Sequence, residues 1–472
     1  MRTRRLVLPY VFLVGLPLLC TAAVLKFGHN LAAAAVSSAK AVAVPASAAG
    51  PVALPRFILQ IAVIIIFARA VGALFKRIRQ PQVVGEMAAG ILLGPSLLGA
   101  FAPGVSAALF PPASLDYLNA LSQIGLILFM FLVGLSLDTK ELRKYGHAAV
   151  LTSHVSIAVP LCLGTAAALF LYPRLSTNGV TFTGFALFMG AAMSITAFPV
   201  LARILAERNM MRTKLGSLAI ACAAVDDVTG WCVLTYIVVL IRVSHASAGV
   251  WFTIAGAVVY ILAMFFGVRP MLKWFEKSYI RHGRLTDNAV AGIILLLLAS
   301  ALCTDFLGVH MLFGAFLLGT IMPDHADFVE HLKQKFEPVT ITLFLPLFFA
   351  YSGLRTSIAI IAEHGVWIYT IFILFVAVAG KLGGCLVAAR FAGMGWRDAT
   401  SLGLLMNTRG LMQLVILNVG MDIGVISPIV FSMMVLMALF TTAMTMPLLD
   451  LTCSAPQLET ELPAGRSMAQ SA

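Results

Sequence analysis

The sequence predicts an all-α polytopic membrane protein, and three observations support this fold class. The 472-residue chain is 60% hydrophobic and only 11% charged, whereas soluble globular chains carry about 25% charged residues. Apolar runs of about 20 residues, enough for a membrane-spanning helix, recur along most of the chain. Basic residues concentrate in alternate loops. The net charge of +12 is therefore interpreted as loop charge that orients helices, and no nucleic-acid partner is expected.

The two ends of the chain are predicted to differ from the region between them. A basic start and an apolar run over residues 1–25 predict a signal peptide or an extra transmembrane helix. Residues 26–55 are rich in Ala, Val and Ser and are expected to form an external linker. A membrane domain is expected over 56–450, followed by a short tail over 451–472. This tail has no room for a nucleotide-binding regulatory domain.

The membrane domain contains thirteen apolar segments, and an N-terminal helix would make fourteen. They span 56–75, 83–100, 116–136, 148–172, 181–202, 215–241, 250–268, 287–304, 309–323, 338–352, 365–389, 398–420 and 426–449. The seven cysteines are scattered, mostly inside these segments. This scatter is typical of buried apolar cysteines, so neither a disulfide framework nor a metal site built on cysteines is expected.

Loop charges predict the orientation of these segments. One set of alternate loops holds 19 Lys and Arg residues, whereas the other set holds 3. Because cytoplasmic loops carry the excess of basic residues, the first segment should run from outside to inside, and the C-terminus should be cytoplasmic. The short tail favours a bacterial inner membrane.

An internal repeat relates segments that lie seven apart. Residues 89–95 read AGILLGP and residues 314–320 read GAFLLGT; residues 137–139 read LDT and residues 354–356 read LRT. The fifth and twelfth segments share a Thr before an apolar run, at Thr196 and Thr408. Because seven is odd, the two copies cross the membrane in opposite senses, which is the inverted-topology plan of many secondary transporters.

Two adjacent aspartates are the clearest charges inside an apolar segment. Asp226 and Asp227 lie near the middle of the sixth segment, and the basic residues at similar depth are Lys381 and Arg409. Intramembrane charges are costly and usually functional. A purely structural pair with Lys381 needs one carboxylate, which leaves the second free to exchange a proton for a cation. Successive helical residues point about 100° apart, so the two carboxylates can face different neighbours.

The fifth and twelfth segments are predicted to be broken helices that cross. Pro199 follows Thr196 in the fifth segment, and a proline disrupts the preceding helical turn. The twelfth segment contains Asn407, Thr408 and Arg409 before a glycine. Irregular backbone at membrane depth is tolerated where it lines a cavity. Arg409 is expected to offset exposed carbonyl ends there, unless it faces a loop.

Four motifs resemble those of the monovalent cation/proton antiporter-2 family. They are QPQVVGE at 80–86, GILLGPSLLG at 90–99, SITAFPVLARIL at 194–205 and MNTRGL at 406–411. The first two are similar to the entry of the family's first core helix. The last two are similar to the branch that holds the plant cation/proton exchangers. The resemblance covers about residues 56–449.

The resemblance implies a sodium/proton antiporter-type fold and a homodimer in the lipid bilayer. It implies exchange of sodium or potassium for protons by an elevator-like movement of a core part, with no cofactor. Asp227 would be the main cation and proton carrier, Asp226 would pair with Lys381, and Thr196 would approach the ion. The double Asp with a Lys resembles the electrogenic members. A role in pH homeostasis would follow.

Departures from the family leave the cation open. The plant exchangers often carry Asn where Asp226 stands, and they have a long cytoplasmic tail. Potassium is suggested by the plant branch, and sodium by the double Asp with Lys381.

A sodium-coupled symporter of an organic solute with a related fold is the alternative function. A channel is a further possibility. An intramembrane aspartyl protease would need two facing carboxylates on different helices, which adjacent aspartates do not supply, so the chain is not expected to be an enzyme.

Overall fold

The computed structural model describes residues 2–31, 33, 54–136, 139–177, 179–208, 210–211, 213–243, 247–323, 325–363 and 365–452. Within these residues every regular element is a helix. In the described part of the chain, twelve helices are long and apolar enough to cross a membrane, and a bent pair raises the number to 13. The predicted all-α polytopic fold class is therefore confirmed. Most of the expected linker and tail lies outside the described residues.

Each expected apolar segment contains a helix, but several helices differ in length from the prediction, among them those expected at 148–172, 250–268, 309–323 and 338–352. The segment expected at 309–323 is α14 (Met311–Thr320), whose 10 residues are too few to cross a bilayer alone. The segment expected to end at 268 passes through α11 (Ser247–Ala263) and the π-helical turn η1 (Met264–Val268) into α12 (Arg269–His282). This wider turn precedes Pro270, so the chain passes the proline without ending the helix.

Eight helices form what we call the crossover group, because it contains both broken helices. Its members are α7 (Thr139–Leu175), α8 (Phe182–Ser194), α9 (Phe198–Glu207), α10 (Lys214–Val243), α18 (Trp367–Phe391), α19 (Trp396–Met406), α20 (Leu411–Asp422) and α21 (Pro428–Thr452). Within it, α7 packs against α8, α10 and α18. The group therefore surrounds the mid-membrane charges with apolar helices.

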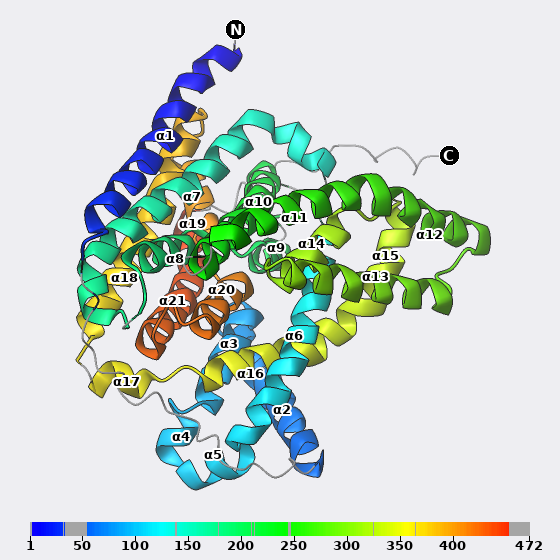
Figure 1. Ribbon diagram of the computed structural model, residues 1–472, viewed down its shortest axis with the longest axis horizontal. Coiled ribbons are helices and arrows are strands. Elements are labelled where there is room, and N and C mark those ends of the chain that lie inside the picture. Colours follow the sequence, from blue (N-terminus) through cyan, green and yellow to red (C-terminus); the bar gives the residue numbers. More distant parts are fainter. Residues whose placement is uncertain are drawn as a thin grey trace, which may run out of the picture.

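Seven further helices and one π-helical turn form what we call the scaffold group, which does not include α1, α11 or α12. Its members are α2 (Leu54–Arg77), α3 (Gln82–Leu93), α6 (Pro112–Leu135), α13 (Asp287–Phe306), α14, α15 (Ala326–Val339), the π-turn η2 (Thr340–Phe344) and α16 (Leu345–Leu354). The short helices α4 (Leu98–Phe101), α5 (Pro103–Leu109) and α17 (Ile358–Glu363) connect longer ones. In Figure 1 the scaffold group fills the lower and right-hand parts, and most of the crossover group lies at the upper left.

The inverted repeat is visible in the packing of the scaffold group. Helix α3 packs on α16, and α14 packs on α6. The repeat relates α3 to α14 and α6 to α16, so these two helix contacts are equivalent under the repeat. Each is a backbone approach through glycine: a Cβ on Gly353 would meet the Gly90 backbone, and a Cβ on Gly319 would meet the Phe131 carbonyl. Part of one sequence match, 137–138, lies outside the described residues.

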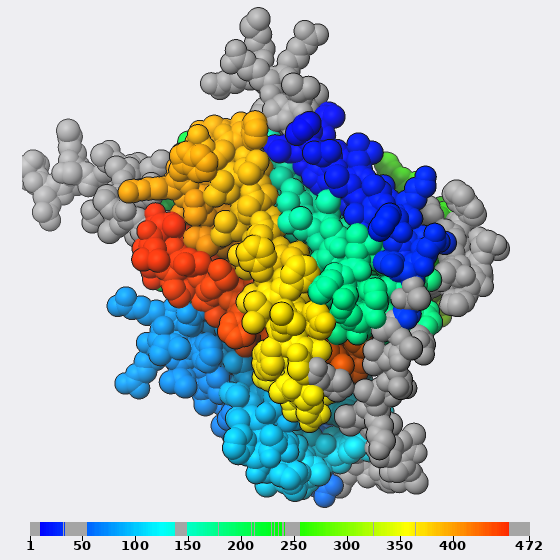
Figure 2. Space-filling model, turned by 90° about the vertical axis from the view of Figure 1, so that its left-hand side faces the viewer, coloured from blue at the N-terminus to red at the C-terminus, as the bar shows by residue number. Residues whose placement is uncertain are grey.

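The N-terminal helix α1 (Arg2–Gly28) packs on the crossover group. Leu13 and Val14 contact a small cluster that includes Val155 of α7 and Ala388 of α18. The Tyr10 hydroxyl also shares a hydrogen bond with Nδ1 of His154 on α7, at 3.3 Å. Figure 2 shows α1, in dark blue, lying along α7 on this face.

Candidate functional site

The two broken helices meet at their breaks, in the middle of the crossover group. The Thr196 hydroxyl donates a hydrogen bond to the carbonyl oxygen of Met406 at 2.8 Å. The Ala197 amide donates to the Thr408 carbonyl at 3.1 Å. Pro199 lies in the first turn of α9, where a proline is tolerated because no helical hydrogen bond is lost. The crossover predicted from the sequence therefore forms, and two carbonyl oxygens of the second break accept hydrogen bonds from a hydroxyl and an amide of the first.

A buried arginine from one break stabilises the end of the opposite helix. Arg409 is fully buried, and its guanidinium donates to the carbonyl oxygens of Ile195 at 2.7 Å, Ala192 at 3.3 Å and Met193. The last carbonyls of a helix lack partners within it and carry a partial negative charge. The Arg409 amide itself donates to the Thr442 hydroxyl at 2.9 Å. Arg409 thus offsets the partial negative charge of the exposed carbonyl groups at the end of α8.

Asp226 and Lys381 form a buried ion pair. Their side chains are 0% exposed, and Lys381 Nζ lies 2.6 Å from Asp226 Oδ2. The hydroxyls of Ser156 and Ser153 donate to Asp226 Oδ1 at 2.9 and 3.4 Å. Lys381 also donates to the Ser194 carbonyl oxygen at the end of α8. The pair therefore joins α7, α8, α10 and α18, and further hydrogen bonds offset part of the cost of burying two charges.

Asp227 points away from this network. Among the residues that the structure describes, neither of its carboxylate oxygens has a hydrogen-bond partner, although the residue is 0% exposed. The backbone amide of Phe198, at the start of α9, lies near it but does not meet the geometry of a hydrogen bond. Both amide atoms of Asn407, another fully buried residue, also lack partners within the described part of the chain. An orphaned buried carboxylate is strongly unfavourable when charged, so Asp227 needs a bound proton or a bound cation.

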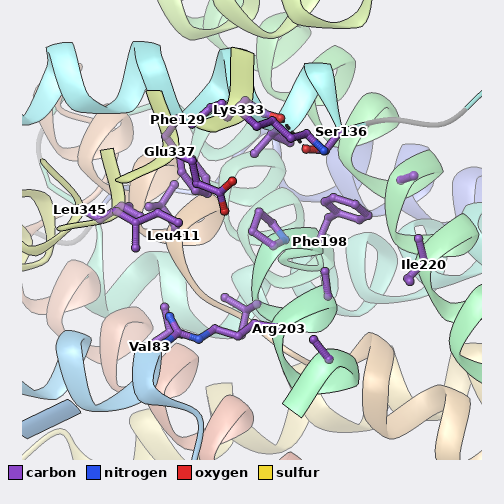
Figure 3. Close-up of a pocket in the computed structure, with 18 of the residues that line it drawn as sticks. Val83, Phe129, Ser136, Phe198, Arg203, Ile220, Lys333, Glu337, Leu345 and Leu411 are labelled. Atoms are coloured by element: carbon purple, nitrogen blue, oxygen red, sulfur yellow. Dashed lines mark hydrogen bonds between the residues drawn. The ribbon is translucent and has the colours of Figure 1, made fainter. Parts of the chain in front are cut away.

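A cavity of about 870 Å³ lies between the crossover and scaffold groups. Phe198, Pro199 and Ala224 line it, and Ala224 precedes Asp227 by about one helical turn. In Figure 3 the Glu337 carboxylate extends from the scaffold side into the space opposite Arg203 of the crossover group. Asp227 is not itself in the lining, so the cavity reaches neighbours of the orphaned carboxylate rather than the carboxylate itself.

Sequence reasoning missed the two serines that hold Asp226. Ser153 and Ser156 are three residues apart, so they lie on one face of α7. This polar face inside an apolar segment was the available signal. No sequence pattern indicated that the Asn407 side chain would lack hydrogen-bond partners among the described residues. This depends on which neighbouring groups already form hydrogen bonds with the hydroxyls around it.

The chain matches a family model and several named proteins. The model described as "Sodium/hydrogen exchanger, transmembrane" matches residues 61–450. The chain is 43% identical to the Na(+)/H(+) antiporter NhaS4 of Synechocystis sp. over 82% of this chain and 95% of that protein. It is 40% identical to the cation/H(+) antiporter 17 of Arabidopsis thaliana, with 84% and 48% covered. It is 31% identical to the K(+)/H(+) antiporter 1 of Saccharomyces cerevisiae, with 84% and 46% covered.

The fold matches that of a solved antiporter. The sodium proton antiporter MjNhaP1 of Methanocaldococcus jannaschii aligns over 86% of this chain and 98% of that chain, with a TM-score of 0.61 and 15% identity. At this identity the match shows the fold alone. The chain spans about half the length of the plant and yeast relatives and nearly all of the cyanobacterial one. Nothing in these matches favours the symporter alternative.

Proposed function

The chain belongs to the sodium/hydrogen exchanger family, and on that premise we propose that it exchanges a monovalent cation for protons across a membrane. The family consists of transporters, not enzymes. The observation that carries the proposal is Asp227, a fully buried carboxylate without a hydrogen-bond partner among the described residues, beside the crossing of two broken helices. A proton and a small cation can each neutralise this group, but not both together. Competition for one carboxylate is the chemical basis of antiport.

Asp226 and Lys381 are proposed to make the exchange electrogenic. The ammonium of Lys381 lies 2.6 Å from the Asp226 carboxylate. If the cation also binds Asp226, this ammonium must move away. A lysine displaced into an apolar site loses a proton readily, because burial penalises its charged form. One cation would then be exchanged for two protons, one from Asp227 and one from Lys381. Thr196 is proposed to approach the ion only if its hydroxyl turns from the Met406 carbonyl.

An elevator-like movement of the crossover group is proposed to carry the ion. The cavity separates this group from the scaffold group, so sliding one past the other would close it. Its lining includes Arg203 of α9 and Lys333 of α15, and basic residues of this kind are expected on the inner side. The conformation is therefore proposed to be inward-facing. The scaffold group is proposed to form a homodimer in the lipid bilayer.

The remaining assignments follow the same reasoning. We place the membrane domain at 56–450, as supported by the family match over 61–450, and propose that α1 adds a helix because it packs on α7. A bacterial inner membrane is proposed because the relative that the chain spans almost completely is cyanobacterial, and a cytoplasmic C-terminus is proposed from the loop charges. Sodium is the first cation to test, because the relative that the chain spans almost completely is named a sodium antiporter.

The test is proton flux in proteoliposomes that enclose a pH dye. With an imposed proton gradient, added sodium or potassium should move protons and restore the dye signal. Asp227→Asn should abolish this response, because an amide exchanges no proton. The matched control is Asp305→Asn, at the exposed end of α13, which should respond like the unaltered protein. Retained exchange in Asp227→Asn would refute the site, and no response to either cation in well-inserted protein would refute antiport of these ions.

A further inference from the structure

A second polar cluster joins the two helix groups on the face opposite the cavity. Arg355 follows the last turn of α16 in the scaffold group. Its guanidinium lies 2.7 Å from Asp422 Oδ1 and donates to Asn418 Oδ1 at 2.9 Å, both on α20 of the crossover group. The same guanidinium lies 5.9 Å from the ring centre of Phe431 on α21. A single scaffold side chain therefore contacts two crossover helices.

Asn418 closes this cluster with a second bond across the boundary. It is 3% exposed, and its amide donates to the Ser352 hydroxyl of α16 at 2.8 Å. Nearby, the Ser357 amide donates to the Ser432 hydroxyl of α21 at 3.0 Å. Ser432 is fully buried. The outer boundary between the groups is thus closed by the Arg355–Asp422 ion pair, by the hydrogen bonds of Asn418, and by the hydrogen bond between Ser357 and Ser432.

The inner boundary of the same two groups differs. There the cavity separates the groups, and Arg203 of α9 donates to the neutral Gln82 side chain of α3 at 2.7 Å. Because α16 contributes Leu345 and Phe349 to the cavity and Arg355 to the cluster, one helix connects the open and the closed side. Any sliding of the crossover group that closes the cavity must act on the contacts at the other end of α16.

We propose that Arg355, Asp422 and Asn418 form an outer latch that holds the inward-facing state and must open once in every transport cycle. The inference rests on the proposed alternation between two states, but not on which cation is carried. Arg355 is 17% exposed and Asp422 is 45% exposed. Ion pairs with this much solvent access contribute little to stability. The latch is therefore weak enough to open and still biases the equilibrium between the two states.

The test measures accessibility from each side, in a variant whose native cysteines are replaced. Ser432→Cys reports opening of the outer boundary, and Ile220→Cys, in the cavity lining, reports inner access. A membrane-impermeant maleimide is added from the outside or the inside. Arg355→Gln or Asp422→Asn should speed outer labelling about fivefold, as expected for loss of one partly exposed ion pair. Inner labelling should stay constant or fall.

Two controls make the outcome specific. Arg208 and Asp450 form an ion pair at 2.6 Å wholly inside the crossover group, so Arg208→Gln should leave outer labelling unchanged. Swapping the charges, Arg355→Asp with Asp422→Arg, should restore the slow rate.

Four outcomes would overturn the latch: unchanged outer labelling in the Arg355 and Asp422 variants, faster labelling at both reporters, an equal effect of Arg208→Gln, or no restoration by the charge swap. Labelling needs no transport. Proton flux in the same vesicles therefore tests antiport separately, and its failure would leave the latch result standing.

Discussion

At the scale of single residues, the buried ion pair of Asp226 and Lys381 depends on both partners. Each charge is out of water, and each is stabilised by the other and by polar groups of α7 and α8. Removing one partner leaves the other charge buried and unpaired. Such removals cost about 3–5 kcal/mol, whereas replacing both partners by neutral groups costs much less.

This difference gives a double-substitution prediction. Lys381→Met and Asp226→Asn should each lower the free energy of unfolding by about 3–5 kcal/mol, and the double variant should lose less than the sum. The melting temperature in detergent measures each effect, and charge movement in proteoliposomes should fall in both single variants. Unchanged melting together with unchanged charge movement in Lys381→Met would refute the pairing.

The charges at the site could be foreseen, but their partners could not. Asp226, Asp227 and Lys381 interrupt apolar segments, so the cost of burying them is visible in sequence alone. Two features depend on how two distant breaks dock: Arg409 binds the carbonyls at the end of α8, and the Asn407 side chain has no hydrogen-bond partner within the described residues. Such docking leaves no local pattern.

At the scale of helices, two crossings in the scaffold group depend on glycine. Helix α16 approaches α3 so closely that a Cβ on Gly353 would meet the Gly90 backbone. Helix α14 approaches α6 in the same manner at Gly319. Small residues allow such approaches in membranes, where close packing drives helix association. The two crossings should therefore be equally intolerant of side chains.

We expect Gly353→Ala and Gly319→Ala each to destabilise the protein by about 1–3 kcal/mol, the usual cost of overpacking. Gly383→Ala is the control, since Gly383 lies within α18 and nothing lies within 4 Å of its added Cβ. That change should be neutral or stabilising, because alanine favours helices over glycine. Melting temperatures compare the three. Equal melting of Gly353→Ala and Gly383→Ala would disprove the tight crossing.

Apolar length predicted where the helices lie but not where all of them end. The segment at 309–323 is apolar apart from His310 and Thr320, yet α14 ends at Thr320 after 10 residues. The segment expected to end at 268 continues to His282, since π-helical geometry before Pro270 keeps the helix intact. Both differences arise from backbone geometry, to which hydrophobicity is insensitive.

At the scale of the whole molecule, the two helix groups differ in how each boundary is closed. The inner boundary holds a cavity, whereas the outer boundary holds several direct bonds. If transport works by sliding one group against the other, the inner boundary must close when the outer boundary opens. A covalent bond across the outer boundary should therefore stop transport without touching Asp227.

The pair Ser357 and Ser432 offers such a bond. The Ser357 amide lies 3.0 Å from the Ser432 hydroxyl, so standard bond lengths keep the two Cα atoms within about 7 Å of each other, close to the roughly 4.4–6.8 Å that a disulfide needs. Ser357 is fixed to the scaffold by its neighbours, since the Thr356 carbonyl and the Ile358 amide both bond to Ser96. In a background without native cysteines, Ser357→Cys with Ser432→Cys should lose cation/proton exchange on oxidation and recover it with a reductant.

The control pair lies inside the crossover group, where Ser401 donates to the Thr452 hydroxyl at 3.1 Å. Ser401→Cys with Thr452→Cys should keep its exchange after oxidation, because a bond within a group that moves as one body constrains nothing. Proton flux in proteoliposomes measures both pairs, and gel mobility confirms that each disulfide has formed. Full exchange by the oxidised Ser357→Cys and Ser432→Cys pair would mean that the outer boundary stays closed throughout transport. The sliding of one group past the other would then be wrong, and the ion would have to reach Asp227 through rearrangement inside the crossover group alone.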